Sequence, residues 1–292
     1  MAAAEQSIQN KPGDPLGYYY KGVALGDLAD EKPAGDRASQ YKEMNNSFET
    51  AQTVADTVET DVSKQINNIS SLKVNLWAKE YNKGIDYVTK DSVRNSVSNP
   101  QELAIKHLQN ATIIIPDSAR TWNVLSQIAY NADSLELAID SKEEFFKRAD
   151  NPSADDYTII AAYYINNGNL DKAITKLQEG IEKYPDNVNI TTTLADAYQR
   201  NGESEKSIGI VQDLVDQDPQ NVKYRINLGS QIYQSALRKS EKASEYFDHI
   251  EELKAQQENV SGSQKEELQA SIDELSKKRD SLLAESNSLT ES

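Results

Sequence analysis

The sequence contains no cysteine, which excludes disulfide bonds and thiolate sites and leaves the redox compartment undetermined. It has only two histidines, His107 and His249, which lie far apart without the spacing of metal ligands. Because His107 adjoins Leu108 on an expected packed helix, we expect it at the surface or at the boundary of the core. No run of about 18 apolar residues occurs, so the sequence predicts no membrane-spanning segment.

Signatures of catalysis are also lacking. Gly22, Gly26 and Gly35 have neither the lysine nor the strand context of a phosphate-binding loop. The acidic pair at 155–156 falls at an expected helix start, where negative charge favours the helix dipole without any catalytic role. We therefore expect a protein that is not an enzyme, with no catalytic residue, no metal site and no cofactor.

Basic residues are outnumbered, with 31 lysines and arginines against 47 aspartates and glutamates and a net charge of −16. So acidic a surface repels phosphate groups, which makes nucleic acids and anionic membranes poor partners. The charge suits basic or neutral partners, although an acidic surface is usually a solubility device. We expect a protein or peptide partner of unknown identity, no nucleic acid, and no membrane-spanning contact.

What the chain does have is a period of 34 residues. Pro185 and Pro219 share this spacing, as do Gly168 and Gly202, and a tyrosine pair at 164 and 198 follows it too. Three residue types at three phases make coincidence a poor explanation. A fixed period of this length is typical of a repeat architecture.

Each period contains two amphipathic helices. Between residues 155 and 184, apolar residues at helical spacing form a first stripe, the segment 166–169 stops it, and a second stripe leads to Pro185. Two such helices cannot bury their apolar faces alone and must stack on neighbouring pairs. Helix boundaries are expected near Gly168, Pro185, Gly202 and Pro219, with no strand in residues 119–234.

These residues resemble the tetratricopeptide repeat family, whose pattern has an aromatic, Leu-Gly and Tyr on the first helix, Ala on the second and a closing Pro. One repeat supplies Tyr157, Ile160, Ala161, Tyr164, Ala173, Leu177 and Pro185, and the next supplies Thr191, Leu194, Ala195, Tyr198, Ser207, Val211 and Pro219. The sequence resembles a bacterial member of this family whose front half carries irregular, inserted repeats. The resemblance implies an all-α fold, a right-handed superhelical solenoid of antiparallel helix pairs.

The match is regular over residues 119–234 and irregular before 119, so residues 1–234 are expected to form a solenoid of about five to six repeats. In the front half, Tyr18 and Gly22 mark a first helix, and residues 77–88 mark another. The stripe of Met44, Phe48 and Ala51 continues through Val54, Val58, Val62, Ile66 and Ile69, which predicts one very long second helix. Its face is open to two interpretations, a packed core or a docking surface.

Residues 235–292 form a polar segment, expected to be either a helical pair hinged at 260–263 or partly disordered. Both ends of the sequence are expected to be truncated, with a natural start and an irregular capping helix as the alternative. Loss of the front would also remove a signal or anchor. The location is therefore open, with the cell envelope or periplasm, as a trimmed lipoprotein, set against the cytoplasm.

The resemblance places partner binding on the concave face, which the first helices line. Carried over by phase, the inner positions are Asn123, Gln127, Tyr130, Thr158, Ala162, Ile165, Thr192, Asp196, Gln199, Ile226, Ser230 and Tyr233, with Tyr19, Val23, Tyr81 and Ile85 in the irregular half. Amides there suit a peptide backbone and aromatic rings can anchor side chains. Tyr19 and Tyr81 could instead be covered by a missing front repeat.

Some members of this family clamp the acidic C-terminus of a chaperone with lysines, arginine and asparagines. The corresponding positions here carry Asn123 and Gln127, then Ile159, then Asn189 and Thr193, so the cations are absent. We therefore expect no chaperone-tail carboxylate clamp. Two functions remain: a non-catalytic protein- or peptide-binding scaffold, or the helical accessory domain of a larger enzyme or of a secretion or envelope assembly.

Overall fold

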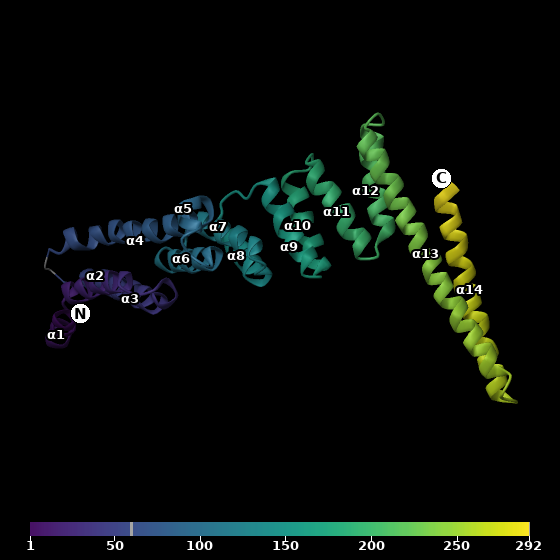
Figure 1. Ribbon diagram of the computed structural model, residues 1–292, viewed down its shortest axis with the longest axis horizontal. Coiled ribbons are helices and arrows are strands. Elements are labelled where there is room, and N and C mark those ends of the chain that lie inside the picture. Colours follow the sequence, from purple (N-terminus) through teal and green to yellow (C-terminus); the bar gives the residue numbers. More distant parts are fainter. Residues whose placement is uncertain (59–60, 292) are drawn as a thin grey trace. The chain divides into compact units, whose positions relative to one another are not determined.

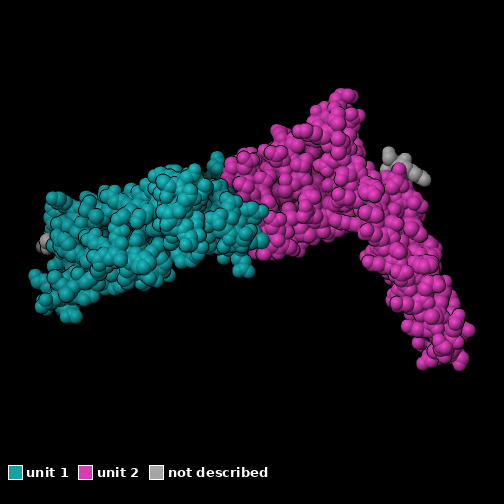
Figure 2. Space-filling view, viewed as in Figure 1, with its two compact units in different colours: residues 1–152 teal, residues 153–292 magenta. Residues whose placement is uncertain are grey.

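The computed structural model describes residues 1–58 and 61–291, and this part of the chain contains helices and turns but no strand. It divides into two compact units, residues 1–152 and 153–292 (Figure 2). Within each unit, helices that follow one another along the chain pack side by side in antiparallel pairs (Figure 1). The predicted fold class, an all-α superhelix of antiparallel helix pairs, is confirmed.

Unit 1 contains the irregular repeats before residue 119 and the first regular pair after it. Its elements are α1 (Ala2–Asn10), α2 (Pro15–Asp30), the short 3-10 helix η1 (Ala34–Asp36), α3 (Ala38–Ala55), α4 (Ser63–Thr89), α5 (Asp91–Arg94), α6 (Pro100–Ile114), α7 (Ala119–Asn131) and α8 (Leu135–Arg148). The pairs are α2 with α3, α4 with α6, and α7 with α8. The short α5 lies in the inserted stretch between the two helices of the second pair.

Unit 2 contains the regular repeats. Its helices are α9 (Ala154–Asn166), α10 (Leu170–Lys183), α11 (Val188–Arg200), α12 (Ser204–Gln217), α13 (Val222–Gln257) and α14 (Ser263–Glu291). They pair as α9 with α10, α11 with α12, and α13 with α14. The predicted boundaries at the two glycines and two prolines are all confirmed.

The same local devices end and begin the helices of unit 2. Gly168 and Gly202 adopt φ values of 73° and 84°, the left-handed conformation in which glycine is free of side-chain strain. After each proline of the repeat an asparagine caps the next helix, because the side chains of Asn187 and Asn221 accept hydrogen bonds from the N–H groups of the first turn. The residues that end one helix and begin the next therefore recur every 34 residues.

The apolar stripes pack against each other as the period requires. In unit 2, Ile160, Ala161, Ala173, Leu177 and Ala195 are completely buried. In unit 1, one cluster gathers around Met44 and Phe48, and a second gathers around Tyr81, Leu108 and Leu125.

The prediction of one very long second helix through residue 69 is wrong. Helix α3 ends at Ala55, and a tight turn follows in which the N–H groups of Thr57 and Val58 bond to carbonyls three residues back. The side chain of Asp61 accepts a hydrogen bond from the Ser63 N–H, and a new helix begins there. The apolar stripe that the sequence shows is thus divided between two helices, α3 and the long α4.

The polar segment after residue 234 is helical. Helix α13 runs without interruption from the last regular repeat to Gln257, and α14 returns along it. The connection at residues 258–262 ends on Gly262 with φ 66°, within the hinge region that the sequence predicts. Ile250 and Ile272 are the buried contacts of this hairpin.

Candidate functional site

The predicted partner-binding residues of unit 2 lie on its first helices, α9, α11 and α13, and we call this surface the first-helix face. The half-buried members on α9 and α11 are Thr158, Ala162, Ile165, Thr192 and Asp196. On α13, Ile226 and Tyr233 are 67% and 64% exposed, and Ser230 is also exposed. The face therefore changes from partly covered and polar on α11 to open and apolar on α13.

The polar groups on α11 are only partly satisfied within the helix. The Thr192 hydroxyl donates to the carbonyl of Val188 at 2.9 Å, which leaves its oxygen able to accept a further hydrogen bond. The Asp196 carboxylate pairs with Arg200 at 2.9 Å, and both side chains are about half exposed. Such groups can hydrogen-bond to a polypeptide laid across them.

Gln199 departs from the predicted open position. Its side chain is 1% exposed, and neither its oxygen nor its nitrogen has a hydrogen-bond partner among the described residues. The backbone carbonyl of Gln199 accepts a hydrogen bond from Arg238 of α13, so the long last helix lies over this end of α11. The covering helix extends beyond the repeat, which is why the repeat phase alone places Gln199 on the open side.

In unit 1, α7 carries three predicted residues in different environments. Gln127 and Tyr130 are exposed, whereas Asn123 is half-buried. The Asn123 side-chain oxygen accepts a hydrogen bond of 2.6 Å from Lys142, an ammonium group that is completely buried on α8 and lies 4.4 Å from the centre of the Phe145 ring. Asn123 therefore supports a buried charge and does not line an open groove.

Tyr19 and Tyr81 lie in the interior of unit 1, covered by this chain's own helices. Tyr19 is 7% exposed, packs against Phe48 and accepts a hydrogen bond from Asn68. Tyr81 is 6% exposed, stacks on Trp77 and bonds through its hydroxyl to Arg120. Neither ring is presented to a partner: α3 and α4 cover Tyr19, whereas Tyr81 lies on α4 itself and is covered by α6 and α7. Val23 and Ile85 are half-buried core neighbours.

A buried ionic cluster in unit 1 escaped the sequence reasoning. Glu80 of α4 is completely buried, and its carboxylate accepts hydrogen bonds from Arg37 at 2.6 Å and Tyr41 at 2.7 Å. His107 Nδ1 lies 2.6 Å from the second carboxylate oxygen, and Asn110 bonds more weakly at 3.4 Å. The prediction that His107 lies at the surface or boundary of the core is therefore wrong: its ring is 3% exposed.

The cluster fixes the charge state of Glu80. Burial would raise the pKa of this carboxyl, but the hydrogen bonds from His107, Tyr41 and Arg37 oppose it and lower the pKa to about 2. Burial beside the Glu80 charge raises the pKa of Tyr41. An ionised carboxylate accepts only, so the histidine donates from Nδ1. The cluster joins α3, α4, α6 and Arg37, which lies between η1 and α3, through hydrogen bonds and is sealed from solvent, which suits structure and not catalysis.

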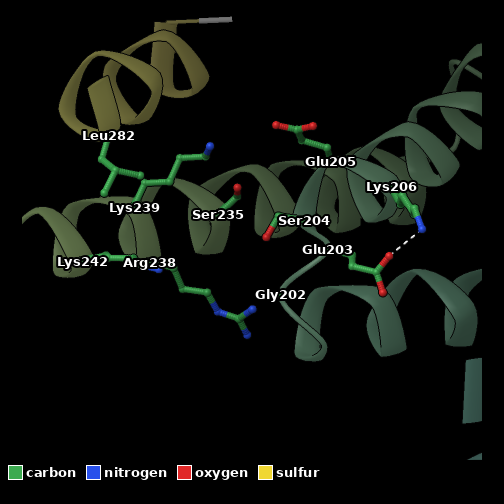
Figure 3. Close-up of a pocket in the computed structure, with 10 residues that line it drawn as sticks. All are labelled: Gly202, Glu203, Ser204, Glu205, Lys206, Ser235, Arg238, Lys239, Lys242 and Leu282. Carbon is green, nitrogen blue, oxygen red and sulfur yellow. Dashed lines mark hydrogen bonds and ion pairs between the residues drawn. The ribbon is translucent and has the colours of Figure 1, made fainter. Parts of the chain in front are cut away.

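A cavity of about 530 Å³ lies between the α12 start, α13 and α14. Figure 3 shows its charged lining, in which Lys206 pairs with Glu203 and Arg238 extends toward the turn at Gly202. Lys239 pairs with Glu285 of α14, and Arg238 bonds to the carbonyl described above. Most of the positive charge here is thus engaged within the protein, so the lining does not specify a ligand.

Two other kinds of site are not found in the described part of the chain. No group of three or more acidic or histidine side chains is arranged to hold a metal ion among residues 1–58 and 61–291. Of the helices described, none combines the length and apolar character needed to cross a bilayer.

Comparison with known proteins identifies the repeat. The family model described as "Tetratricopeptide repeat" matches residues 164–232, from α9 to α13. A search of curated proteins gave no match. Similar solved structures include YrrB, described as "a TPR protein with an unusual peptide-binding site", at 15% identity and TM-score 0.40, with 53% of this chain and 79% of that chain covered. The MamA protein is 18% identical at TM-score 0.40, with 70% and 95% covered.

Proposed function

This chain is a tetratricopeptide-repeat protein, and from that premise we propose that it is a non-catalytic scaffold that binds a protein or peptide on the first-helix face of unit 2. Repeats of this kind present extended surfaces formed by successive helices. The observation that carries the proposal is the exposure of Ile226 and Tyr233 beside the half-exposed polar groups of α11. Large apolar side chains that lie together in contact with water are typical of an interaction surface, whereas single ones are not.

The chemistry of the face suits an extended or helical polypeptide. The hydroxyl of Thr192 and the carboxylate of Asp196 offer acceptors for backbone N–H groups, and the ring of Tyr233 offers an anchor for an apolar side chain. Asp196 keeps a half-exposed negative charge in a chain whose net charge is −16, which favours a neutral or basic segment at this point.

The test compares two matched threonines. Thr192 on α11 and Thr175 on α10 both donate their hydroxyls to the carbonyl four residues earlier, so replacing either one removes the same local hydrogen bond. A photo-crosslinking amino acid is introduced at each position in turn, and the protein is irradiated in an extract of its source cells. We expect a crosslinked polypeptide from position 192 and none from position 175.

Once that polypeptide is identified, Thr192→Arg should weaken its binding at least about tenfold, because the larger charged side chain occupies the face. Thr175→Arg should leave binding unchanged. Equal crosslinking from both positions, or crosslinking from 175 alone, would assign recognition to the outer helices and contradict the proposal.

A further inference from the structure

Helix α13 carries an uncovered apolar stripe. Five large side chains, 44% to 67% exposed, occupy it: Val222, Ile226, Tyr233, Leu237 and Phe247. At about 100° per residue they fall within roughly 80° of the helix circumference, along about 38 Å of its length. This is a continuous face, and not a scatter of single exposed residues.

The stripe is not the side by which α13 joins its own unit. The buried residues of this helix are Gln231, Ser235, Ala236, Ala243 and Ile250, and they face α12 and α14. At about 100° per residue the buried side chains occupy roughly the arc from 180° to 320° around the helix, counted from Val222, and the apolar stripe occupies the neighbouring arc from about 340° to 60°. The open stripe therefore requires a separate explanation.

We infer that this stripe is a self-association surface, on which a second copy of the chain lays its own α13 in antiparallel orientation. The inference rests on the proposed function, since Ile226 and Tyr233 belong to the first-helix face, and it names a partner for the α13 part of that face. The stripe is nearly palindromic about residue 235. An antiparallel pair in this register places Val222 against Phe247 of the second copy, and Tyr233 against its Leu237.

The intervening positions of the stripe are small. Ser230, Ser240 and Ser244 are all exposed on it. In the same register Ile226 meets the small Ser244 of the second copy, and Ser230 meets its Ser240. Large residues opposite small ones let two helices approach closely, and a two-fold pair repeats every such contact twice.

Charges at the two ends favour the antiparallel arrangement. Lys223 and Arg225 flank the stripe near the start of α13, where positive charge opposes the helix dipole, and no acidic residue lies in that first turn. Glu245 and Asp248 flank the other end. Within the described part of the chain, none of these four side chains forms an ion pair. Antiparallel pairing brings Lys223 next to Asp248 of the second copy, whereas parallel pairing would bring like charges together.

The test uses the absence of cysteine from the sequence. Ser230→Cys and Ser240→Cys variants are prepared separately, mixed in equal amounts and oxidised. Within one helix these positions lie about 15 Å apart, beyond the reach of a disulfide. We expect a disulfide-linked dimer in the mixture and none in either variant alone, because in the antiparallel register position 230 faces 240 and neither position faces itself.

Further variants measure the strength of association by sedimentation. Tyr233→Asp should weaken association about 30-fold or more, because it places a charge at the centre of the apolar contact. The control Leu283→Asp places the same charge at another exposed apolar residue, 40% exposed on α14, and should leave association unchanged. Lys223→Glu and Asp248→Lys should each weaken the dimer, and the chain carrying both substitutions should recover it.

A monomer at all concentrations, or crosslinking of the single Ser230→Cys variant with itself, would overturn the inference. An unrelated helix captured on the stripe of a monomeric chain would overturn it as well. Crosslinking from Thr192 is read independently of these assays. A chain that captures a polypeptide at position 192 but does not dimerise would support the scaffold function and contradict self-association. A chain that dimerises but captures no polypeptide there would support self-association and contradict the scaffold function.

Discussion

Glu80 and His107 join the two helices of the second pair in unit 1 through a contact of 2.6 Å between Oε2 and Nδ1, and both side chains are buried. Arg37 completes the charge balance from the loop after α2, at 2.6 Å from the other carboxylate oxygen. The cluster thus ties α4 and α6 to the preceding repeat. Removing one partner of such a buried group leaves the others unsatisfied, which costs far more than removing a surface pair.

The first prediction concerns acid. The folded-state pKa of Glu80 is about 2, against an ordinary value of 4.5, so ionised Glu80 stabilises the folded state. A lowered folded pKa gives stability that is fully present above pH 4.5 and is lost as pH falls toward 2. The difference corresponds to about 3 kcal/mol in the free energy of unfolding of unit 1.

Tryptophan fluorescence measures this selectively, because both tryptophans, Trp77 and Trp122, lie in unit 1. We expect Glu80→Gln to be much less stable than the wild type in denaturant at pH 7. The difference in the free energy of unfolding between the two proteins, which we call the gap, should narrow steadily below pH 4.5. Glu102→Gln is the control, since that carboxylate is exposed and bonded to Lys106 on the surface. A gap of constant size from pH 7 to pH 3 would show that Glu80 is not the titrating group.

The second prediction concerns Asn123. Because its oxygen accepts from the buried Lys142 ammonium, Asn123→Ala should lower the free energy of unfolding of unit 1 by about 1–3 kcal/mol. Gln127→Ala, one turn along α7 and exposed, should change it by less than about 0.5 kcal/mol. Denaturation followed by tryptophan fluorescence compares the two, and equal losses would mean that the lysine does not depend on this amide.

The regular repeats could be predicted from the sequence because their signals are local. A glycine at positive φ, an asparagine cap and a closing proline each act within a few residues, so Gly168, Asn187 and Pro185 locate helix ends without any knowledge of packing. The apolar stripes then fix which side of each helix is buried. For residues 235–292 the sequence leaves two alternatives open, a hinged helical pair or partial disorder, and the structure has two helices that meet near Gly262.

The ionic cluster could not be predicted, because it depends on which face of α4 meets α6. Glu80 directly precedes Tyr81 and follows Trp77 by three residues, and this neighbourhood gives no sign of Arg37 or His107. The position of His107 beside Leu108 in an apolar stripe leads to the prediction of a surface or boundary histidine, but it is equally compatible with the observed burial against Glu80. Similarly, the end of α3 at residue 55 depends on the geometry of the turn that follows, which the spacing of apolar residues does not reveal.

The candidate site divides in the same way. Repeat phase correctly places Thr192 and Tyr233 on first helices with exposed or half-exposed side chains, because the family spacing is intact there. It misplaces Gln199 and Tyr19, which are covered by helices longer than the repeat, α13 and α4, and it misplaces Tyr81, which lies on the long α4 and packs against α6 and α7. The repeat phase therefore fails to predict side-chain exposure on and beside the helices that are longer than the repeat. Binding by the remaining positions stays a prediction.

The third prediction tests the core of unit 2. Leu177→Ala should cost about 2–5 kcal/mol, because this side chain is completely buried where α10 packs on its neighbours. Leu283→Ala on α14 removes the same atoms from a side chain that is 40% exposed, and should cost less than about 1 kcal/mol. Unit 2 contains no tryptophan, so hydrogen exchange of its helices is the appropriate measurement. Similar losses for both variants would mean that Leu177 is not enclosed.

The last prediction compares two glycines in helix interiors. A Cβ atom at Gly22 would lie 2.5 Å from the ring of Phe48, which is itself 2% exposed and cannot move aside. Gly22→Ala should therefore destabilise unit 1 by about 1–3 kcal/mol through overpacking. Gly209, within α12, has nothing within 4 Å of the same position, so Gly209→Ala should stabilise its helix by about 0.5–1 kcal/mol. Tryptophan fluorescence in denaturant measures the first change, and hydrogen exchange across α12 the second. If Gly22→Ala also stabilised the protein, α2 and α3 could not pack as closely as the structure shows, and the pairing of these two helices would need revision.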